Sequence, residues 1–519
     1  MLDSSHSDGV DGLDANACYA AVLARDTRFD GRFFTGVKTT GIYCRPICPA
    51  RIPKRAHCTF YPSAAAAETV GFRACLRCRP EAAPGTPAAA GTAATVTRAL
   101  RLIQEGALDR DSVGALAERL GLGERQVRRL FATHLGASPE AVGATRRLLA
   151  ANQLLRDTDL PISDICFAAG FRSLRRFNDA FATRYKETPS AVRARAKPHT
   201  RKTISRPKGG DTKADDARAA PTFPFDIKLR LGFRPPFDWG LMLDYFRSRL
   251  IPGVEVVTET SYRRSVSLEG ARAFIEATAD PTRHILWVRV LAETPFPLAK
   301  LATRARQIFD LDAQPAAIAA HFTGDPLIGP LVAARPGLRV PGAYDGFELG
   351  MRAILGQQVS VKGASTLAGR LVMRYGTALD LTPGPDWPTH LFPTPEQILA
   401  AGLPHLATLG LPSSRAATLF NLGRAVAAQG LQLNPTAPLE ATCKQLLGLK
   451  GMGAWTVSYI ALRALSDPDA FPEGDLGLQK AAAPKGGRLS AKDLRSLAQS
   501  WRPWRGYAAL HLWTSLASE

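Results

Sequence analysis

The sequence has no long apolar run: no stretch of its 519 residues approaches the roughly 18 apolar residues that a membrane-spanning helix needs. Cysteine is also scarce, and the eight cysteines are too few for a disulfide-stabilised scaffold of this length. The N-terminal segment, residues 1–17, is polar and acidic with no apolar core, so it does not read as a secretory signal. We therefore expect no membrane association and a cytoplasmic location.

The charge of the chain is strongly unbalanced toward basic residues. Lysine and arginine number 66 against 46 aspartates and glutamates, which gives a formal net charge of +20. So large a charge usually indicates a polyanionic partner, and nucleic acid is the first candidate. The alternative is a basic surface that serves only solubility. At roughly 100–200 residues per domain, the length predicts about three to five domains.

Five of the eight cysteines lie close together, between Cys44 and Cys78. Four of them form two pairs, C-x3-C and C-x2-C, separated by a loop, which is the pattern of a closed tetrahedral zinc site. We expect one Zn2+, because soft thiolates suit this ion and the ion lowers the thiol pKa. The predicted ligands are Cys44, Cys48, Cys75 and Cys78, with Cys58 as a spectator. Their spacing does not decide whether the site is structural or holds a nucleophile.

The sequence around these cysteines resembles a known family. TTGIYCRPICPAR (residues 39–51) and GFRACLRCRP (residues 71–80) are similar to the N-terminal domain of the Ada adaptive-response proteins. The resemblance implies that one zinc-bound cysteine irreversibly accepts a methyl group from a methylphosphotriester in DNA. Cys44 matches that acceptor, and Thr40, Arg51 and Arg73 match positions that contact DNA.

Methylation of such a site has an electrostatic consequence. Zn2+ with four thiolates has a net charge of roughly −2, and methylation of one sulfur leaves roughly −1. Because this removes repulsion beside a polyanion, we expect methylated Cys44 to increase the affinity for DNA.

Two Arg-rich segments, Ser112–Pro139 and Pro161–Arg193, each read as a helix, a turn and a basic helix. A helix-turn-helix places the second helix in the major groove, although a helical hairpin with no DNA role is the alternative. The segment from about residue 95 to 195 resembles AraC-type transcription regulators, which implies two adjacent reading helices. The polar residues expected on these helices are Arg125, Gln126, Arg128 and Arg129 in the first, and Arg172, Ser173, Arg175, Arg176 and Asn178 in the second.

The chain beyond Phe223 begins with alternating apolar and polar residues. Residues 225–233, 254–270 and 284–293 read as antiparallel strands, and 238–250 reads as an amphipathic helix. From about Pro297, apolar periodicity broken by glycine and proline predicts helices. Within this part, LKGMG (residues 449–453) is a tight turn between two helices, and Lys450, Gly451 and Gly453 are expected to bring the backbone up to a DNA phosphate.

This turn, together with Asp475, resembles the helix-hairpin-helix DNA glycosylases, and residues from about 225 to the C-terminus resemble their AlkA-type 3-methyladenine glycosylase II branch. The resemblance implies that Asp475 is catalytic, that Trp455, Tyr459 and Trp513 form an aromatic base pocket, and that a leucine wedge fills the gap left by the flipped base. Gln358 stands at the wedge position here. The alternatives are a helix cap or surface carboxylate for Asp475 and core packing for the aromatic residues.

The chemistry of base excision suits these residue types. Cleavage of the N-glycosidic bond builds positive charge on the sugar, which a carboxylate stabilises. The target nucleotide is first flipped out of the duplex, and aromatic faces hold an electron-poor alkylated base.

Three further features narrow the expected activity. Trp455 stands where lyase-type relatives have a Schiff-base lysine, so we expect no β-lyase step and an abasic site as product. No four-cysteine cluster follows the hairpin, so no iron–sulfur centre is expected. The sequence also has no Pro-Cys-His-Arg motif, so we expect no O6-methylguanine methyltransferase domain.

The combined prediction is a multidomain α+β protein of a bacterial cytoplasm that senses and repairs alkylated DNA. Its expected partners are damaged and promoter double-stranded DNA and RNA polymerase. The alternative is a transcription regulator whose C-terminal part binds lesions without cleaving them. The predicted units are a zinc–cysteine domain (15–80), a linker (81–95), an all-α double helix-turn-helix domain (96–195), a second linker (196–222), an antiparallel α/β subdomain (223–310) and an all-α helix-hairpin-helix domain (311–519).

Overall fold

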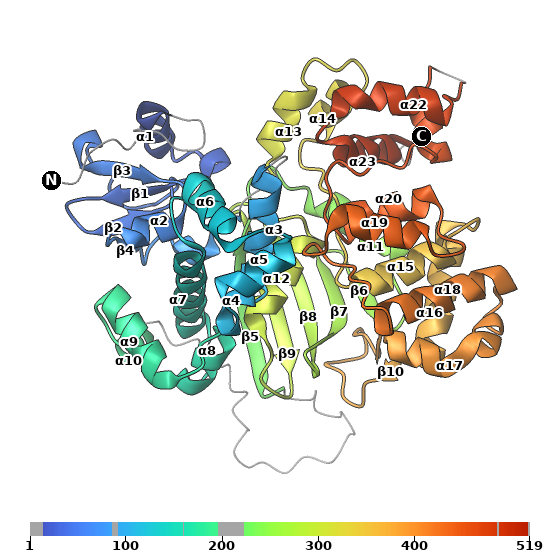
Figure 1. Ribbon diagram of the computed structural model, residues 1–519, viewed down its shortest axis with the longest axis horizontal. Helices are drawn as coiled ribbons and strands as arrows, with labels where there is room; N and C mark the ends of the chain where they lie inside the picture. Colours follow the sequence, from blue (N-terminus) through green and yellow to red (C-terminus); the bar gives the residue numbers. More distant parts are fainter. Residues whose placement is uncertain (1–13, 86–91, 159, 196–222, 485–486, 517–519) are drawn as a thin grey trace, which may run out of the picture.

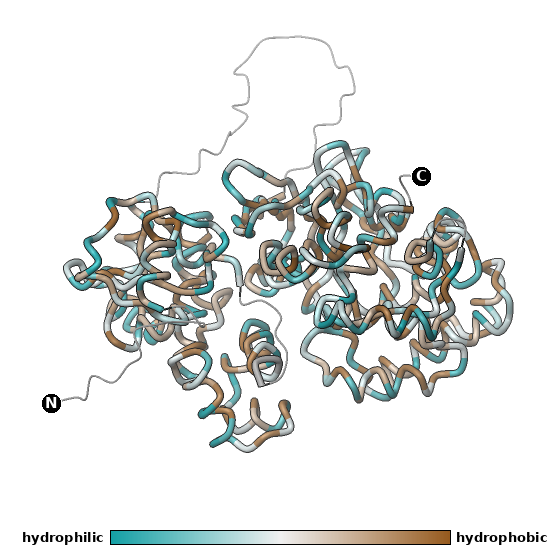
Figure 2. The backbone as a smooth tube through the Cα atoms, turned by 90° about the horizontal axis from the view of Figure 1, so that it is seen from above, coloured by the Kyte–Doolittle hydropathy of each residue, from teal (hydrophilic) through white to brown (hydrophobic). Residues whose placement is uncertain are grey.

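The computed structural model describes residues 14–85, 92–158, 160–195, 223–484 and 487–516. A small β domain lies at one end of the molecule, a helical array follows it, and a five-stranded sheet flanked by helices forms the rest (Figure 1). Apolar and polar segments alternate along the helices in Figure 2, as expected of helices that bury one face. No helix in these ranges is both long and apolar enough to cross a bilayer.

The N-terminal domain is built on a four-stranded sheet with the order β3-β1-β2-β4. Strands β2 and β4 pair in parallel, with Tyr43 opposite Ala74, so Cys44 at the end of β2 and Cys75 directly after β4 meet at one edge. Its elements are α1 (Ala15–Ala24), β1 (Phe34–Val37), β2 (Ile42–Cys44), β3 (Cys58–Tyr61), α2 (Ala64–Thr69) and β4 (Arg73–Ala74).

The next part is entirely helical in the described residues and contains the two predicted helix pairs, α5–α6 and α8–α9. Ser112 is the N-cap of α5, where its side chain accepts a hydrogen bond from the Ala115 amide. Ser173 is the N-cap of α9, where its side chain accepts a hydrogen bond from the Arg176 amide. The helices are α3 (Thr92–Gln104), α4 (Ala107–Arg110), α5 (Val113–Leu120), α6 (Glu124–Leu135), α7 (Pro139–Asp157), α8 (Ile162–Ala168), α9 (Leu174–Tyr185) and α10 (Pro189–Arg195).

A five-stranded antiparallel sheet with the order β5-β9-β8-β7-β6 follows. Strand β8 was not among the predicted strands, because its sequence ARAFIEATAD is rich in alanine and has low β-propensity. It forms because β7 and β9 pair with it on both sides. The elements are β5 (Phe225–Gly232), α11 (Trp239–Arg249), β6 (Glu255–Val257), β7 (Ser261–Leu268), β8 (Ala271–Asp280), β9 (Ile285–Ala292) and α12 (Leu298–Ile308).

The C-terminal part is helical, as predicted, apart from a short strand pair, β10 (Thr377–Ala378) with β11 (His390–Leu391). The hairpin predicted at residues 449–453 joins α19 to α20. The helices are α13 (Pro315–Phe322), α14 (Ile328–Ala334), α15 (Gly346–Leu355), α16 (Val361–Tyr375), α17 (Pro395–Ala407), α18 (Ser413–Ala427), α19 (Leu439–Leu447), α20 (Ala454–Arg463), α21 (Leu476–Ala481), α22 (Ala491–Leu497) and α23 (Arg505–Leu516).

One hydrophobic core connects the first three parts: Tyr43, Phe181 and Ile275, each from a different part, belong to the same buried cluster. The structure describes both ends of the segment expected to be the first linker. The Gly85 amide donates a 2.7 Å hydrogen bond to Asp312 Oδ1, and α3 already begins at Thr92. Residues 86–91 and the second predicted linker, 196–222, lie outside the described residues.

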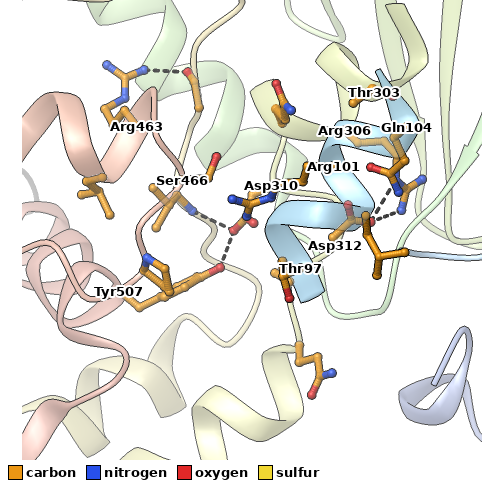
Figure 3. A pocket seen from close by; sticks show the side chains of 18 of the residues that line it. Thr97, Arg101, Gln104, Thr303, Arg306, Asp310, Asp312, Arg463, Ser466 and Tyr507 are labelled. Atoms are coloured by element: carbon orange, nitrogen blue, oxygen red, sulfur yellow. Dashed lines mark hydrogen bonds and ion pairs between the residues drawn. The ribbon is translucent and has the colours of Figure 1, made fainter. Parts of the chain in front are cut away.

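Helix α3 also contacts the C-terminal part. Arg98 donates to the Thr436 carbonyl at 2.7 Å and Arg101 to the Pro435 carbonyl at 3.3 Å. Beside these contacts lies a pocket of about 100 Å³, into which Arg101 extends from α3 and which Asp310 and Asp312 also line (Figure 3). The loop that α3 contacts leads directly into α19, so the helical array packs against the segment that precedes the hairpin.

Candidate functional sites

The four predicted zinc ligands meet at one edge of the N-terminal sheet. The sulfur atoms of Cys44, Cys48, Cys75 and Cys78 all lie within 4.8 Å of one another. Cys48 Sγ and Cys75 Sγ are 3.8 Å apart, and zinc–sulfur bonds of about 2.3 Å in a tetrahedron require about the same separation. Cys58 stands outside the cluster, with its thiol donating to the Lys54 carbonyl. The donor set therefore fits zinc.

The cluster is more accessible on the side of Cys44 than on the side of Cys78. Cys44 and Cys48 are half-buried, whereas Cys75 and Cys78 are buried. The Arg45 amide donates to Cys78 Sγ at 3.3 Å, which stabilises negative charge on that sulfur. Cys44 is therefore a sulfur that an incoming group can reach.

A cavity of about 330 Å³ opens beside Cys44 and Cys48. The three residues predicted to contact DNA, Thr40, Arg51 and Arg73, all line this cavity. Thr40 and Arg51 are exposed, and Arg73 is half-buried. The fold thus brings two arginines, a hydroxyl and the predicted acceptor around one opening, which is a suitable environment for a phosphate group.

The residue before Cys44 connects this site to the helical array. Tyr43 donates to Glu68 Oε1 at 3.0 Å, and Thr145 of α7 donates to Glu68 Oε2 at 2.5 Å. Arg184 of α9 donates to the Glu68 carbonyl at 2.6 Å. Burial raises the pKa of Glu68, and Arg184, Thr145 and Tyr43 oppose that rise. Sequence reasoning missed Glu68, because nothing local marks it within the run AAAAET.

The predicted reading helices α6 and α9 present their polar residues to solvent. Arg125, Gln126 and Arg129 are exposed, and Arg128, also exposed, pairs with Glu124 and Glu140. Of the residues predicted for the second reading helix, Arg175, Arg176 and Asn178 are exposed on α9, Arg172 is exposed just before it, and Ser173 is half-buried and caps the helix.

The hairpin turn has the backbone geometry that its glycines predict. Gly451 has a φ of 92°, which an L-residue rarely adopts. Gly453 is the N-cap of α20, and a Cβ there would meet no atom within 4 Å, while Lys450 is exposed. No side chain caps the start of α20, and this end of a helix favours anions.

A second loop lies against this hairpin. Gln357 donates to the Gly451 carbonyl at 3.1 Å and to Thr456 Oγ1 at 3.2 Å, and Arg415 in turn donates to the Gln357 carbonyl. The neighbouring Gln358, predicted at the wedge position, is exposed and has a φ of 55°. Gln357 was not predicted; its role depends on contacts with residues almost a hundred positions away.

Asp475 is half-buried and accepts hydrogen bonds from two tryptophans. Trp455 Nε1 donates to Oδ2 at 2.7 Å, and Trp513 Nε1 donates to Oδ1 at 3.0 Å. Oδ1 also accepts from the Leu478 amide at 2.9 Å, so Asp475 is the N-cap of α21 as well. The capping alternative is thus correct as geometry, but it does not account for the two indole bonds.

Tyr459 completes the aromatic group. Its ring stacks on Trp455, with centroids 5.3 Å apart and planes inclined by 9°. Trp455 and Tyr459 lie one turn apart on α20, Trp513 comes from α23, and all three are half-buried rather than sealed in the core. The structure therefore places the predicted carboxylate and aromatic residues together and within reach of solvent.

Comparison with known proteins gives matches along the same segments. Family models match as the metal binding domain of Ada (residues 17–81), a helix-turn-helix domain (116–195), the AlkA N-terminal domain (228–345) and the HhH-GPD superfamily base excision DNA repair protein (351–504). The chain is 40% identical over 503 residues to a probable bifunctional transcriptional activator/DNA repair enzyme AlkA of Mycobacterium tuberculosis, covering 97% of both chains.

Two Escherichia coli K12 proteins match different parts of the chain. DNA-3-methyladenine glycosylase 2 is 36% identical over 284 residues, which cover 54% of this chain and 95% of that protein. The bifunctional transcriptional activator/DNA repair enzyme Ada is 38% identical over 123 residues, which cover 24% of this chain and 33% of that protein.

Proposed function

Because the chain belongs to the family of bifunctional transcriptional activators and DNA repair enzymes, we propose that it has two DNA-directed activities. Its C-terminal part excises N-alkylated purines such as 3-methyladenine at Asp475. Its N-terminal part transfers a methyl group from a DNA methylphosphotriester to Cys44, and the helix-turn-helix pairs then bind promoter DNA more tightly. We also propose that the domain boundaries are those predicted above from the sequence.

The observation that most supports excision is the carboxylate of Asp475, held by two indole N–H groups at 2.7 and 3.0 Å beside the stacked rings of Trp455 and Tyr459. Three donors fix the carboxylate in one orientation, so no reorganisation is needed when charge develops nearby. The aromatic faces hold an extruded, electron-poor base by stacking and cation–π attraction.

The proposed reaction is hydrolysis of the N-glycosidic bond. As the bond between C1′ and the base lengthens, its electron pair leaves with the base, and Asp475 stabilises the positive charge on the sugar. Alkylation makes the base cationic, so it departs as a neutral molecule. A water molecule adds to C1′ and loses a proton, which leaves an abasic site. Trp455 supplies no amine for a Schiff base, so the strand remains uncut.

The DNA backbone is proposed to bind along the hairpin. Lys450, Gly451 and Gly453 present a positive side chain and open amides to a phosphate, and Gln357 holds the neighbouring loop against them. Gln358, which is exposed in that loop, is proposed to enter the space that the flipped nucleotide leaves.

Methyl transfer is proposed as an in-line displacement. Cys44 Sγ, as a thiolate, attacks the methyl carbon of the phosphotriester, an S–C bond forms, the C–O bond breaks, and the phosphodiester leaves with the electron pair. Zinc, when bound by the four cysteines, keeps the sulfurs deprotonated at neutral pH. Arg51 and Arg73, which line the same cavity, position the phosphate. RNA polymerase is the proposed partner of the DNA-bound protein.

Product analysis tests the excision proposal. Incubation of methylated duplex DNA with the full chain is expected to yield free alkylated purine and an intact strand with an abasic site. A nicked strand would contradict the monofunctional mechanism, and bound DNA without released base would favour a regulator that only recognises lesions.

Mass spectrometry tests the transfer proposal. After incubation with phosphate-methylated DNA, a single added methyl group is expected on Cys44. An unmodified Cys44 would make the cluster a structural zinc site.

A further inference from the structure

Arg463 is a buried guanidinium directly behind the proposed base pocket. It lies on the same face of α20 as Trp455 and Tyr459, because the three residues are spaced by four. Its Nε donates to the Pro341 carbonyl at 2.6 Å, Nη2 to the Gly342 carbonyl at 3.0 Å, and Nη1 to the Tyr459 hydroxyl at 2.5 Å. The hydrogen bonds fix the guanidinium on three sides.

No carboxylate within ion-pairing distance balances this charge in the part of the chain that the structure describes; Glu255 acts on it only from farther away. Burying a guanidinium without such a partner costs several kcal/mol, and an apolar side chain fills the same space at lower cost. Packing alone therefore does not explain an arginine here.

Tyr245 of α11 holds the other side of the group. Its hydroxyl is 3.2 Å from that of Tyr459, and the Arg463 guanidinium lies 4.9 Å from the Tyr245 ring centre and 5.2 Å from that of Tyr459. Arg249, also on α11, lies 4.2 Å from the Tyr245 ring centre. The α/β subdomain thus forms the rear wall of the site.

We propose that Arg463 is a positioning residue for base excision: with Tyr245, it fixes the Tyr459 ring against Trp455. The inference rests on the proposed function of this pocket. Arg463 is buried and has no hydrogen bond or ion pair with Asp475 in the described residues, whereas it donates to the Tyr459 hydroxyl, so it acts through Tyr459.

The electrostatics of the cluster support this role. Burial raises the pKa of Tyr459, but Arg463, Arg249, the Tyr245 hydroxyl and Arg352 of α15 lower it to about 8 overall. The pKa of Tyr245 rises to about 12, chiefly through burial. As pH rises through 8, Tyr459 therefore loses its proton, its ring becomes richer in electrons, and its negative charge offsets that of Arg463. A cationic base then gains attraction that an uncharged base does not.

The first test needs no substrate. Ultraviolet difference titration of the full chain is expected to show one tyrosine that ionises near pH 8 and is absent from Tyr459→Phe. Removal of an opposite charge at this range shifts a pKa by roughly 1–3 units. Arg463→Met is therefore expected to move that titration upward by at least one unit, and Arg463→Lys by less. Tyr245→Phe removes only a hydroxyl and keeps the packing of the ring. This conservative variant is also expected to raise the pKa of Tyr459.

The second test uses affinity for damaged DNA. The affinity for DNA that carries a cationic alkylated purine is expected to rise through pH 8 in the wild type and to stay flat in Tyr459→Phe, and DNA with an uncharged damaged purine shows no rise in either. If the low tyrosine titration is missing, or persists unchanged in Arg463→Met and Tyr245→Phe, the proposal is wrong. If the titration behaves as expected but the wild type releases no base, the positioning geometry stands and the proposed function fails.

Discussion

Replacement of Gly451 by alanine tests the hairpin through two measurable costs. The φ of 92° costs an L-residue about 1–2 kcal/mol. The new Cβ would also lie 2.0 Å from Thr418 Oγ1 and 3.0 Å from Thr418 Cβ, in space that is already filled. Overpacking of this kind costs about 1–3 kcal/mol. We therefore expect Gly451→Ala to lower the free energy of unfolding by about 2–5 kcal/mol.

Gly453 provides a matched control two residues away. Its φ is −84°, and a Cβ there meets nothing within 4 Å. Gly453→Ala is expected to change the free energy of unfolding by less than about 1 kcal/mol. The same methyl group would stand between the open amides and a DNA phosphate, so this variant is expected to bind DNA more weakly while it remains folded.

Thermal unfolding and DNA binding of the two full-length variants separate these effects. Thr418→Ala removes the closest contact and is expected to make the double variant with Gly451→Ala less destabilised than the sum of the two changes. Equal loss of stability in Gly451→Ala and Gly453→Ala, or a native-like Gly451→Ala, would refute the reasoning from backbone geometry.

Three other predictions concern the remaining sites. Cys44→Ser is expected to lose most bound zinc after dialysis, whereas Cys58→Ser keeps it; zinc loss from both would place Cys58 among the ligands. Glu68→Gln is expected to cost about 1–3 kcal/mol in the free energy of unfolding, because a buried acceptor shared by Tyr43 and Thr145 becomes weaker; unchanged stability would show that the network is dispensable. Burial raises the pKa of Asp310 to about 6, so the folded chain keeps a proton that the unfolded chain has released, and stability falls as pH rises from about 4 to 6. In Asp310→Asn this fall is expected to be smaller, and an identical pH profile would contradict the assignment.

Features set by short stretches of sequence were predictable. The spacing of Cys44, Cys48, Cys75 and Cys78 indicated that they converge. The members of each pair are already close in sequence, so only the loop between the two pairs has to bring all four together. The hairpin glycines and the capped helix pairs follow from local backbone preferences. The resemblance to the Ada, AraC-type and AlkA-type families is confirmed by the matching models.

Residues that act through distant contacts were not predictable. Glu68 bonds to Thr145 from another part of the fold, Gln357 bonds to Gly451, and Arg463 bonds to the carbonyls of residues 341–342. None of these pairings leaves a pattern within a helix or strand. Strand β8 was missed for the same reason, since its neighbours and not its alanines determine its conformation.

Single-turnover release of 3-methyladenine from duplex DNA tests the central role of Asp475 most directly. Glu473→Gln is the matched control, because Glu473 pairs with Arg495 at the surface only two residues away. Loss of one preorganised electrostatic contact typically slows a reaction about 10²–10³-fold. We expect a fall of that size in Asp475→Asn, with unchanged affinity for the lesion and no fall in Glu473→Gln. Release of 3-methyladenine by Asp475→Asn at the wild-type rate would contradict a catalytic role for Asp475.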